Sequence, residues 1–176
     1  MFWQTRVERF ERSHDLRAIL AILADPTDKP YERASAAKAL ADAAGEIGEL
    51  RAEAVLVLLE VADRAGSYIL RQVLFALAEL RVEEALPLFR RAAHDPDFLI
   101  RVFAAHGFDR LADRDSIADL ARLLGDRESQ VREAAVAAIA RLRDGRLRPL
   151  LERTASEDPY EFVRESAREA LTALGR

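Results

Sequence analysis

A repeated pattern of about 31 residues constrains this chain more than any other feature of its sequence. In three segments, Asp95 to Leu111, Asp126 to Leu142 and Asp158 to Leu174, an Asp stands six residues before an Arg. A β-branched apolar residue precedes each Arg, and bulky apolar residues follow it seven and ten positions later. Because such spacings return to one face of a helix, each segment is predicted to contain an amphipathic helix.

Two earlier segments fit the same frame less closely. Asp28 to Ala43 carries Arg33 in the place of the repeated Arg, with Leu40 seven residues later. Arg64 to Leu80 carries Leu70 where the other segments have Arg. The anchor positions 33, 70, 101, 132 and 164 are therefore separated by 37, 31, 31 and 32 residues. Self-similarity at a period of roughly 20 to 50 residues is typical of a solenoid.

The stretches between the anchors also show helical spacing, and short turns rich in Asp, Gly and Pro separate them. This arrangement indicates αα-hairpins stacked in series. We therefore predict an all-α fold, an α–α superhelix (α-solenoid) of about five stacked helix pairs, in a single domain over residues 1–176. The expected divisions are a capping helix over 1–13, with Trp3 packed on the first repeat, and repeats at about 14–45, 46–81, 82–113, 114–144 and 145–176.

Composition excludes several classes of protein. The chain has no cysteine, which excludes disulfides and thiolate metal sites. Its net charge of −4 argues against a nucleic-acid partner, because phosphate contacts need a clustered basic surface. The longest apolar run, Ala54 to Leu59, is too short to span a membrane, and the charged first residues do not form a signal peptide. We expect a cytoplasmic protein with no membrane partner, whose oligomeric state the sequence does not predict.

The segments Asp95 to Arg101 and Asp158 to Arg164 resemble HEAT repeats, in particular the short HEAT-like repeats of the phycobilisome-lyase type. Units of that type often read Asp-Pro-x-x-x-Val-Arg-x-x-Ala-x-x-Ala-Leu, and the units here are shorter than the roughly 40 residues of typical HEAT repeats. The resemblance covers nearly the whole chain. It implies stacked helix pairs whose second helices line a concave surface, and it transfers little function.

Most of the residues that could carry chemistry have a structural interpretation. Each turn Asp is expected to accept backbone N–H groups at a helix start, and each Arg to reach a carboxylate or carbonyl of a neighbouring repeat. The histidines, His14, His94 and His106, lack metal-ligand spacing, so no metal or cofactor is predicted. Asp109 follows His106 at i+3, but no Ser or Cys nucleophile is near in sequence, and no catalytic residue is assigned. Gly107 falls where other repeats carry Ala, which predicts close helix packing.

The positions that should point away from the core do not all carry polar residues. On a helical wheel, the positions two before, one after and five after the anchor lie opposite the apolar stripe. In the first three repeats they are largely aromatic or apolar with interspersed cations, whereas the last two repeats present carboxylates at Glu133, Glu165 and Glu169. Because a contiguous exposed apolar patch usually marks a binding site, we predict a partner-binding surface of Tyr31, Lys38, Tyr68, Arg71, Phe75, Leu99, Val102, Phe103 and His106. The alternative is that Phe75 is simply part of the core.

Two functions of different classes remain open. The favoured one is a non-enzymatic scaffold that holds a protein or peptide in the concave groove, with Tyr68, Phe75 and Phe103 as anchors. The other rests on the resemblance alone and is a bilin-lyase-like enzyme or enzyme subunit. In that case Arg71, His106 and the aromatic residues would hold a flat acidic ligand beside its acceptor protein. Visible absorbance after incubation with a bilin would distinguish the two.

Overall fold

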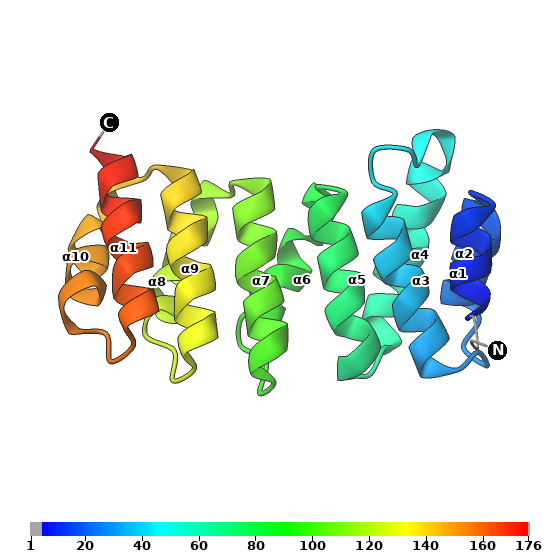
Figure 1. The fold of residues 1–176 in the computed structure, drawn as a ribbon, viewed down its shortest axis with the longest axis horizontal. Helices are drawn as coiled ribbons and strands as arrows, with labels where there is room; N and C mark the ends of the chain where they lie inside the picture. The colour runs from blue at the N-terminus through cyan, green and yellow to red at the C-terminus, as the bar shows by residue number, and fades with distance from the viewer. Residues whose placement is uncertain (1–4, 176) are drawn as a thin grey trace. The chain divides into compact units, whose positions relative to one another are not determined.

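The structure is a computed structural model that describes residues 5–175, so the expected contact of Trp3 lies outside the described residues. Over this range the backbone forms α-helices and short 3₁₀ turns without a strand, which confirms the predicted all-α class (Figure 1). The helices are α1 (Arg6–Arg12), α2 (Leu16–Ala24), α3 (Pro30–Asp42), α4 (Arg51–Arg64), α5 (Ser67–Glu79), α6 (Leu86–Ala92), α7 (Phe98–Leu111), α8 (Ile117–Leu124), α9 (Ser129–Leu142), α10 (Arg148–Glu157) and α11 (Glu161–Leu174). The 3₁₀ turns are η1 (Gly48–Leu50), η2 (Glu83–Ala85), η3 (Arg114–Ser116) and η4 (Gly145–Leu147).

Polar side chains at helix starts account for several of these boundaries. Asp15 is the N-cap of α2, and its carboxylate accepts the Ala18 N–H at 3.0 Å, which satisfies a donor that has no partner within the helix. A serine just before the helical run Tyr68 to Leu80 predicts that Ser67 caps the fifth helix, and this prediction is wrong. Gly66 is the N-cap there, Ser67 is the first helical residue, and no side chain bonds to the cap.

The chain folds as two compact units, Met1–Ala85 and Leu86–Arg176, hereafter the N-terminal and C-terminal units. In the N-terminal unit α3 packs against α5, while α2 packs on α3 and α4 packs on α5. In the C-terminal unit α7, α9 and α11 pack side by side, and α6, α8 and α10 each pack on the helix that follows (Figure 1). Each unit therefore has a layer of first helices and a layer of second helices with the core between them.

The repeat pattern identifies the core correctly. The side chains seven residues after the anchor are buried in four repeats: Leu40, Leu77, Phe108 and Ile139. Leu171, at the same position of α11, is only half-buried, because in the described chain α11 packs on α9 and α10 from one side. A polar exception is Glu32, a buried residue whose Oε1 accepts the Arg6 N–H at the start of α1 at 3.3 Å.

Gly107 permits a close contact between α6 and α7. A Cβ added at this position would lie 2.4 Å from ring atoms of Phe89, which is itself fully buried. The Phe89 ring also meets Phe108 edge to face, with ring centroids 6.5 Å apart. The equivalent positions Ala39, Ala76, Ala138 and Ala170 are all buried, so the predicted row of small residues is a packing requirement.

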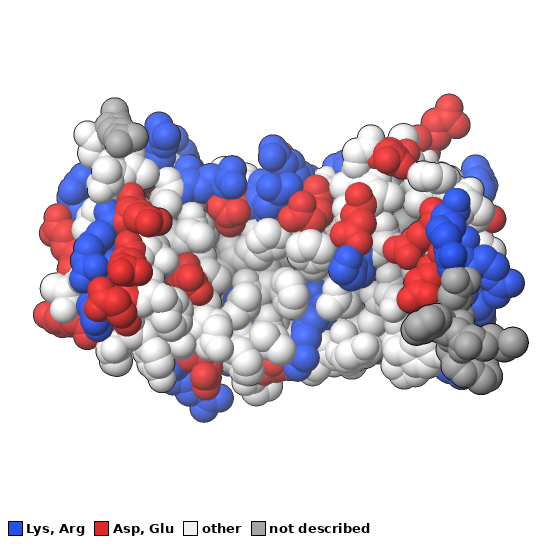
Figure 2. Space-filling model, viewed as in Figure 1, with Lys and Arg blue, Asp and Glu red and all other residues white. Residues whose placement is uncertain are grey.

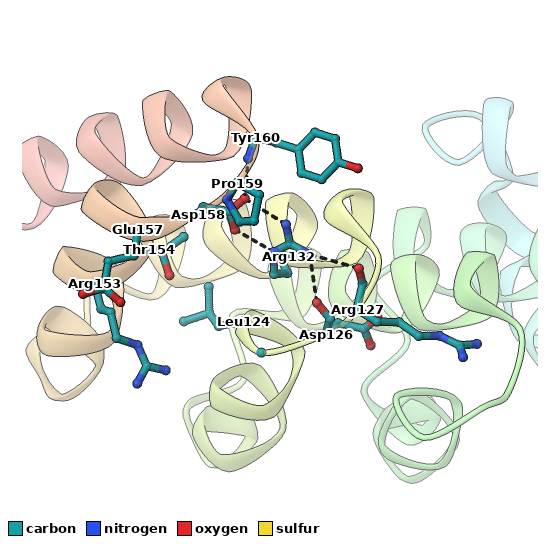
Figure 3. Close-up of a pocket in the computed structure, with 11 residues that line it drawn as sticks. Leu124, Asp126, Arg127, Arg132, Arg153, Thr154, Glu157, Asp158, Pro159 and Tyr160 are labelled. Atoms are coloured by element: carbon teal, nitrogen blue, oxygen red, sulfur yellow. Dashed lines mark hydrogen bonds and ion pairs between the residues drawn. The ribbon is translucent and has the colours of Figure 1, made fainter.

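The Asp and Arg residues of the repeat form a ladder across the C-terminal unit. Arg101 donates from Nε and Nη2 to the two carboxylate oxygens of Asp126, at 2.7 and 2.8 Å. Arg132 makes the same pair of bonds to Asp158, at 2.6 and 2.8 Å. Each Arg also donates from Nη1 to two carbonyls of the turn before its own helix, so that Arg132 lies between the Asp158 carboxylate and the backbone of Asp126 and Arg127 (Figure 3).

Each aspartate that accepts these bonds also accepts a backbone N–H within its own turn. Asp126 accepts the Glu128 N–H and Asp158 accepts the Tyr160 N–H, each at 3.0 Å. The four charged side chains of the two pairs are largely buried. The expectation that each Arg reaches a carboxylate or carbonyl of a neighbouring repeat is therefore confirmed at Arg101 and Arg132. Arg164, on α11, instead bonds to Glu161 of its own helix.

The N-terminal unit departs from this ladder. The frame assigns Asp28 as the turn Asp of the first repeat, which is wrong: the Asp28 carboxylate accepts from Arg6 Nη1 at 2.6 Å. Asp25 takes the turn role, with its Oδ1 accepting the N–H and the hydroxyl of Thr27 at 2.8 and 2.7 Å. The reason is that the turn before Arg33 is longer by two residues than the turn before Arg101, counted from Asp25 and Asp95.

Replacing Gly107 by Ala tests the packing between α6 and α7. Ala ordinarily stabilises a helix by about 1 kcal/mol relative to Gly, but here its methyl group overlaps the Phe89 ring. We expect a net loss of about 1 to 3 kcal/mol in the free energy of unfolding, as for other overpacked cores. Urea denaturation would measure it. In a Phe89→Leu background the same substitution should cost less, and an equal cost in both backgrounds would contradict the steric explanation.

Acidification tests the ladder. Hydrogen bonds from Arg132 hold the pKa of Asp158 below its ordinary value of 3.8, although burial opposes the shift. A carboxylate with a lowered folded-state pKa stabilises the fold above its ordinary pKa, and this contribution is lost as pH falls through the lowered pKa. We expect Asp158→Asn to cost about 3 to 5 kcal/mol near pH 7, since it leaves Arg132 buried without its carboxylate. The difference from wild type should shrink below about pH 4.

Urea denaturation at several pH values, with the exposed Asp115→Asn as control, would follow this difference. The control should show no comparable pH-dependent difference from wild type in the free energy of unfolding, because Asp115 lies outside the ladder. If the destabilisation by Asp158→Asn stayed constant down to pH 2, the Asp158 carboxylate would not be stabilising the fold through its pair with Arg132.

Candidate binding surface

Three of the residues predicted to bind a partner are exposed on the second helices of the N-terminal unit. Tyr31 on α3 is 43% exposed and Tyr68 on α5 is 58% exposed, and both stand two residues before their anchor positions. Lys38 is also exposed and forms an ion pair with Asp42 one turn along α3. The Lys29 Nζ lies 5.7 Å from the centroid of the Tyr31 ring, a cation–π arrangement that leaves the tyrosine at the surface.

The remaining predicted residues of this unit are half-buried. Arg71 and Phe75 on α5 belong to this class, so the Phe75 ring is neither enclosed in the core nor fully open to solvent. Ala34, which the helical wheel places among the outward positions, is 3% exposed, so that expectation is wrong. Its burial follows from the close packing of α3 and α5, because a small side chain on the flank of one helix is covered by the next.

On the C-terminal unit the predicted residues all lie on α7. Leu99, Val102, Phe103 and His106 are half-buried, and of these Val102 lines an open hollow formed with α9 and α11. The hollow has a volume of about 590 Å³. The structure thus distributes the nine predicted residues over α3, α5 and α7, with five in one unit and four in the other.

The hollow on the C-terminal unit has an apolar floor and a polar rim. The floor consists of alanine side chains on α9 and α11, which are too short to fill the space between the helices: Ala134, Ala137, Ala140, Ala170 and Ala173. With Val102, the residues Gln130, Glu133, Val136, Ser166 and Glu169 complete its lining. The helical wheel identified Glu133 and Ala137 as outward positions, but only the packed helices show that short side chains leave a depression there.

Two carboxylates of the lining, and Glu165 next to the lining residue Ser166 in sequence, lack the arginine partner that several other acidic residues of the unit have. Glu133, Glu165 and Glu169 have no ion pair with any residue between 5 and 175, whereas the ladder aspartates and Glu161 are all paired with arginines. Figure 2 shows acidic side chains gathered over α11 and a largely uncharged surface over α9 and α7. The combination of an apolar floor and unneutralised carboxylates is suited to a segment with basic and small apolar side chains.

A second apolar surface, which the sequence reasoning missed, lies on a first helix. Leu56 on α4 is 69% exposed, and it lines a hollow of about 550 Å³ with Val55, Leu59 and Val82. The signal was present in the sequence, because Ala54 to Leu59 is an unbroken apolar run and a helix cannot bury every side of such a run against one neighbour.

The described residues contain no cluster of three or more potential metal ligands. His14 lies 3.6 Å from Glu46 and His94 lies 3.5 Å from Asp119, so both make surface contacts near helix ends. Within residues 5–175, no helix has the length and apolarity needed to cross a membrane.

The chain is similar to proteins built from stacked helical repeats. Residues 91–172 match the family described as HEAT repeats. No curated protein matches the sequence. A designed armadillo repeat protein in complex with peptide (KR)4 has a TM-score of 0.70 and 19% identity, covering 96% of this chain and 85% of that chain. A computationally designed armadillo repeat protein for modular peptide recognition has a TM-score of 0.66 and 20% identity, covering 95% and 85%.

Human deoxyhypusine hydroxylase in complex with glycerol is also similar, with a TM-score of 0.52 and 19% identity, covering 96% of this chain and 76% of that chain. At such identities a likeness concerns the fold alone. These likenesses confirm the predicted α-solenoid class, and with the match to residues 91–172 they support a HEAT-repeat family. None of them distinguishes the phycobilisome-lyase type.

Proposed function

We propose that this protein is a scaffold that binds a peptide or an extended protein segment on its second helices. The observation that carries the proposal is that both units leave apolar side chains uncovered on these helices. The N-terminal unit exposes Tyr31 and Tyr68, and the C-terminal unit has the alanine-floored hollow beside Val102. Monomeric proteins seldom keep such surfaces without a partner that covers them.

The tyrosines are suited to be anchors of binding. A tyrosine side chain buries a large area on contact and has only two side-chain torsions to immobilise, so the entropic cost of ordering it is low. Tyr31 and Tyr68 occupy equivalent positions on helices that pack against each other.

The further contacts that we propose on this unit are Lys38, Arg71 and Phe75. On α7 the proposed contacts are Leu99, Val102, Phe103 and His106.

The carboxylates of the C-terminal unit give the proposed surface a preference for basic segments. Glu133, Glu165 and Glu169 have no cation paired to them within the described residues, so a bound Lys or Arg side chain would gain a charge partner without displacing one. A designed repeat protein of similar fold is described as a complex with the peptide (KR)4, which supports the proposal by analogy of fold. The alternative function, a bilin-lyase-like enzyme or enzyme subunit, remains a prediction from the sequence, and so does the cytoplasmic location.

The aromatic part of the surface is tested by the double substitution Tyr31→Ser and Tyr68→Ser. Because both side chains are exposed, we expect a small change in stability, within about 0.5 kcal/mol. Binding to peptides selected from a random dodecamer library by the wild-type protein should weaken by at least tenfold, as measured by fluorescence anisotropy.

Leu56→Ser is the matched control, since it removes an exposed apolar side chain from a first helix of the same unit. The control should bind the selected peptides as wild type does. If the double variant also kept wild-type affinity, or only the control lost it, the second-helix surface would not be the binding surface.

The acidic part is tested with a fluorescent (KR)4 peptide at low and moderate salt. The triple variant Glu133→Gln, Glu165→Gln and Glu169→Gln should bind this peptide more weakly than wild type, with the difference shrinking as salt screens the charges. A control with the same change in net charge, Glu49→Gln, Glu53→Gln and Glu84→Gln, removes exposed carboxylates from the N-terminal unit. Equal weakening by both triple variants would show that net charge alone attracts the peptide.

A further inference from the structure

The Asp–Arg ladder is incomplete at Arg33, a half-buried arginine that lines a pocket. Arg33 of α3 occupies the same repeat position as Arg101 and Arg132, each of which binds an aspartate of the next repeat. The second repeat offers no such aspartate. The residue that follows α4 is Ala65, whereas the residue that follows α10 is Asp158.

Ala65 and Asp158 are equivalent when counted from the first helix, whereas counting back from the anchor Leu70 gives Arg64, because the turn between α4 and α5 is one residue shorter than the turn between α10 and α11. Each is the C-cap of a first helix with extended backbone, at φ −77° and ψ 139° for Ala65 and φ −60° and ψ 135° for Asp158. Ala65 therefore follows α4 as Asp158 follows α10. We expect a carboxylate introduced at position 65 to lie near Arg33, as Asp158 lies near Arg132.

A pocket surrounds the site in both repeats. Around Arg132 and Asp158 it has a volume of about 290 Å³, with walls from the turn after α8 and from α10 (Figure 3). Around Arg33 it has a volume of about 300 Å³, with walls from the corresponding turn and from α4: Ala24, Pro26, Val57, Glu60, Val61 and Arg64. The two pockets are similar in volume and in the helix and turn that form their walls. The turn after α10 also lines the first pocket, through Asp158, Pro159 and Tyr160, whereas no residue of the turn after α4 lines the second.

The Arg33 guanidinium keeps donors for an external ligand. Its Nε donates to the Leu23 carbonyl at 3.0 Å, and among residues 5–175 no side-chain carboxylate bonds to it. Two carboxylates lie in the neighbourhood and both are engaged. Glu60 is 3.3 Å from Arg64, and Asp25 accepts two hydrogen bonds from Thr27. A half-buried arginine presenting a planar pair of N–H groups is matched by the planar oxygens of a carboxylate.

We propose that this pocket, the Arg33 pocket, binds a carboxylate supplied from outside the chain, in place of the aspartate that the second repeat lacks. The two N–H groups of Nη1 and Nη2 and the nearby Arg64 side chain bind it by charge-assisted hydrogen bonds. The ligand class is a free small carboxylate or the Asp, Glu or terminal carboxylate of a peptide. The site lies at the turn edge of α2 and α4, apart from the second-helix surface, so the two proposals can fail independently.

The test is a titration of the isotope-labelled full chain with sodium acetate against sodium chloride at constant ionic strength. Nuclear magnetic resonance would follow the Nε–H of Arg33 and the amides of Gly66 and Ser67. We expect saturable, acetate-specific shifts in wild type and their loss in Arg33→Gln. Ala65→Asp should also abolish them, because it supplies the carboxylate within the chain, and should raise the midpoint of thermal unfolding.

The C-terminal unit provides the matched positive control. Asp158→Ala removes the carboxylate from Arg132 and should create an acetate site there, with shifts at Arg132 and part of the lost thermal stability restored by acetate but not by chloride. If Asp158→Ala responds in this way while wild type shows no acetate-specific shift at Arg33, the proposal is overturned. It is overturned equally if Ala65→Asp leaves the response of wild type unchanged.

Two further titrations distinguish the sources of the carboxylate. Acetyl-Gly-Glu-Gly-amide carries a side-chain carboxylate, and acetyl-Gly-Gly-Gly carries a terminal one. Tighter binding of either peptide than of acetate assigns the site to a polypeptide ligand, and equal binding assigns it to a free carboxylate. Acetyl-Gly-Gln-Gly-amide, which lacks a carboxylate, should produce no shift at Arg33, and an equal response to it would overturn the carboxylate assignment.

Discussion

The C-terminal unit depends on a bidentate hydrogen-bonded pair between an arginine of one repeat and an aspartate of the next. Arg101 and Arg132 each use one edge of the guanidinium for the carboxylate and the remaining nitrogen for two carbonyls of the turn before their own helix. One side chain therefore fixes both the turn that precedes its helix and the distance to the next repeat. Because the pairs are largely buried, breaking one leaves an uncompensated charge, which is far more costly than losing a surface pair.

This interaction also decides which surfaces are free to bind. The ladder occupies the turn edge, and the apolar stripe of every second helix is buried against the first helices, so the opposite side of each second helix is the part that stays partly open to solvent, apart from the buried Ala34. The residues on this side are not under the same packing constraint as the core residues, and they differ between the repeats. Aromatic residues occupy it on α3 and α5, and alanines with carboxylates occupy it on α9 and α11. Variation on a constant scaffold is how repeat proteins acquire different partners.

The repeat pattern predicted the helices, the core positions and the contact of Arg101 and Arg132 with a neighbouring repeat, because each of these follows from a spacing of the chain, but it did not identify Asp126 and Asp158 as the partners. It was wrong at Asp28, Ser67 and Ala34, and each error has a local cause. The first turn is two residues longer than its counterpart, Gly66 supplies the cap instead of the serine after it, and α5 covers a small side chain that the wheel directs outward. It overlooked Leu56, because an apolar residue within an apolar run does not reveal which side remains uncovered.

The sequence by itself determined the all-helical class, the repeat length, the residues of the core and the chemistry of the ladder, since hydrophobic periodicity and the Asp-to-Arg spacing are properties of the chain. Only the tertiary structure decided how far each outward side chain is exposed, where alanines leave a hollow, and that Ala65 follows α4 as the ladder aspartate Asp158 follows α10. These are properties of packing between helices, and they depend on neighbours that the order of residues does not specify.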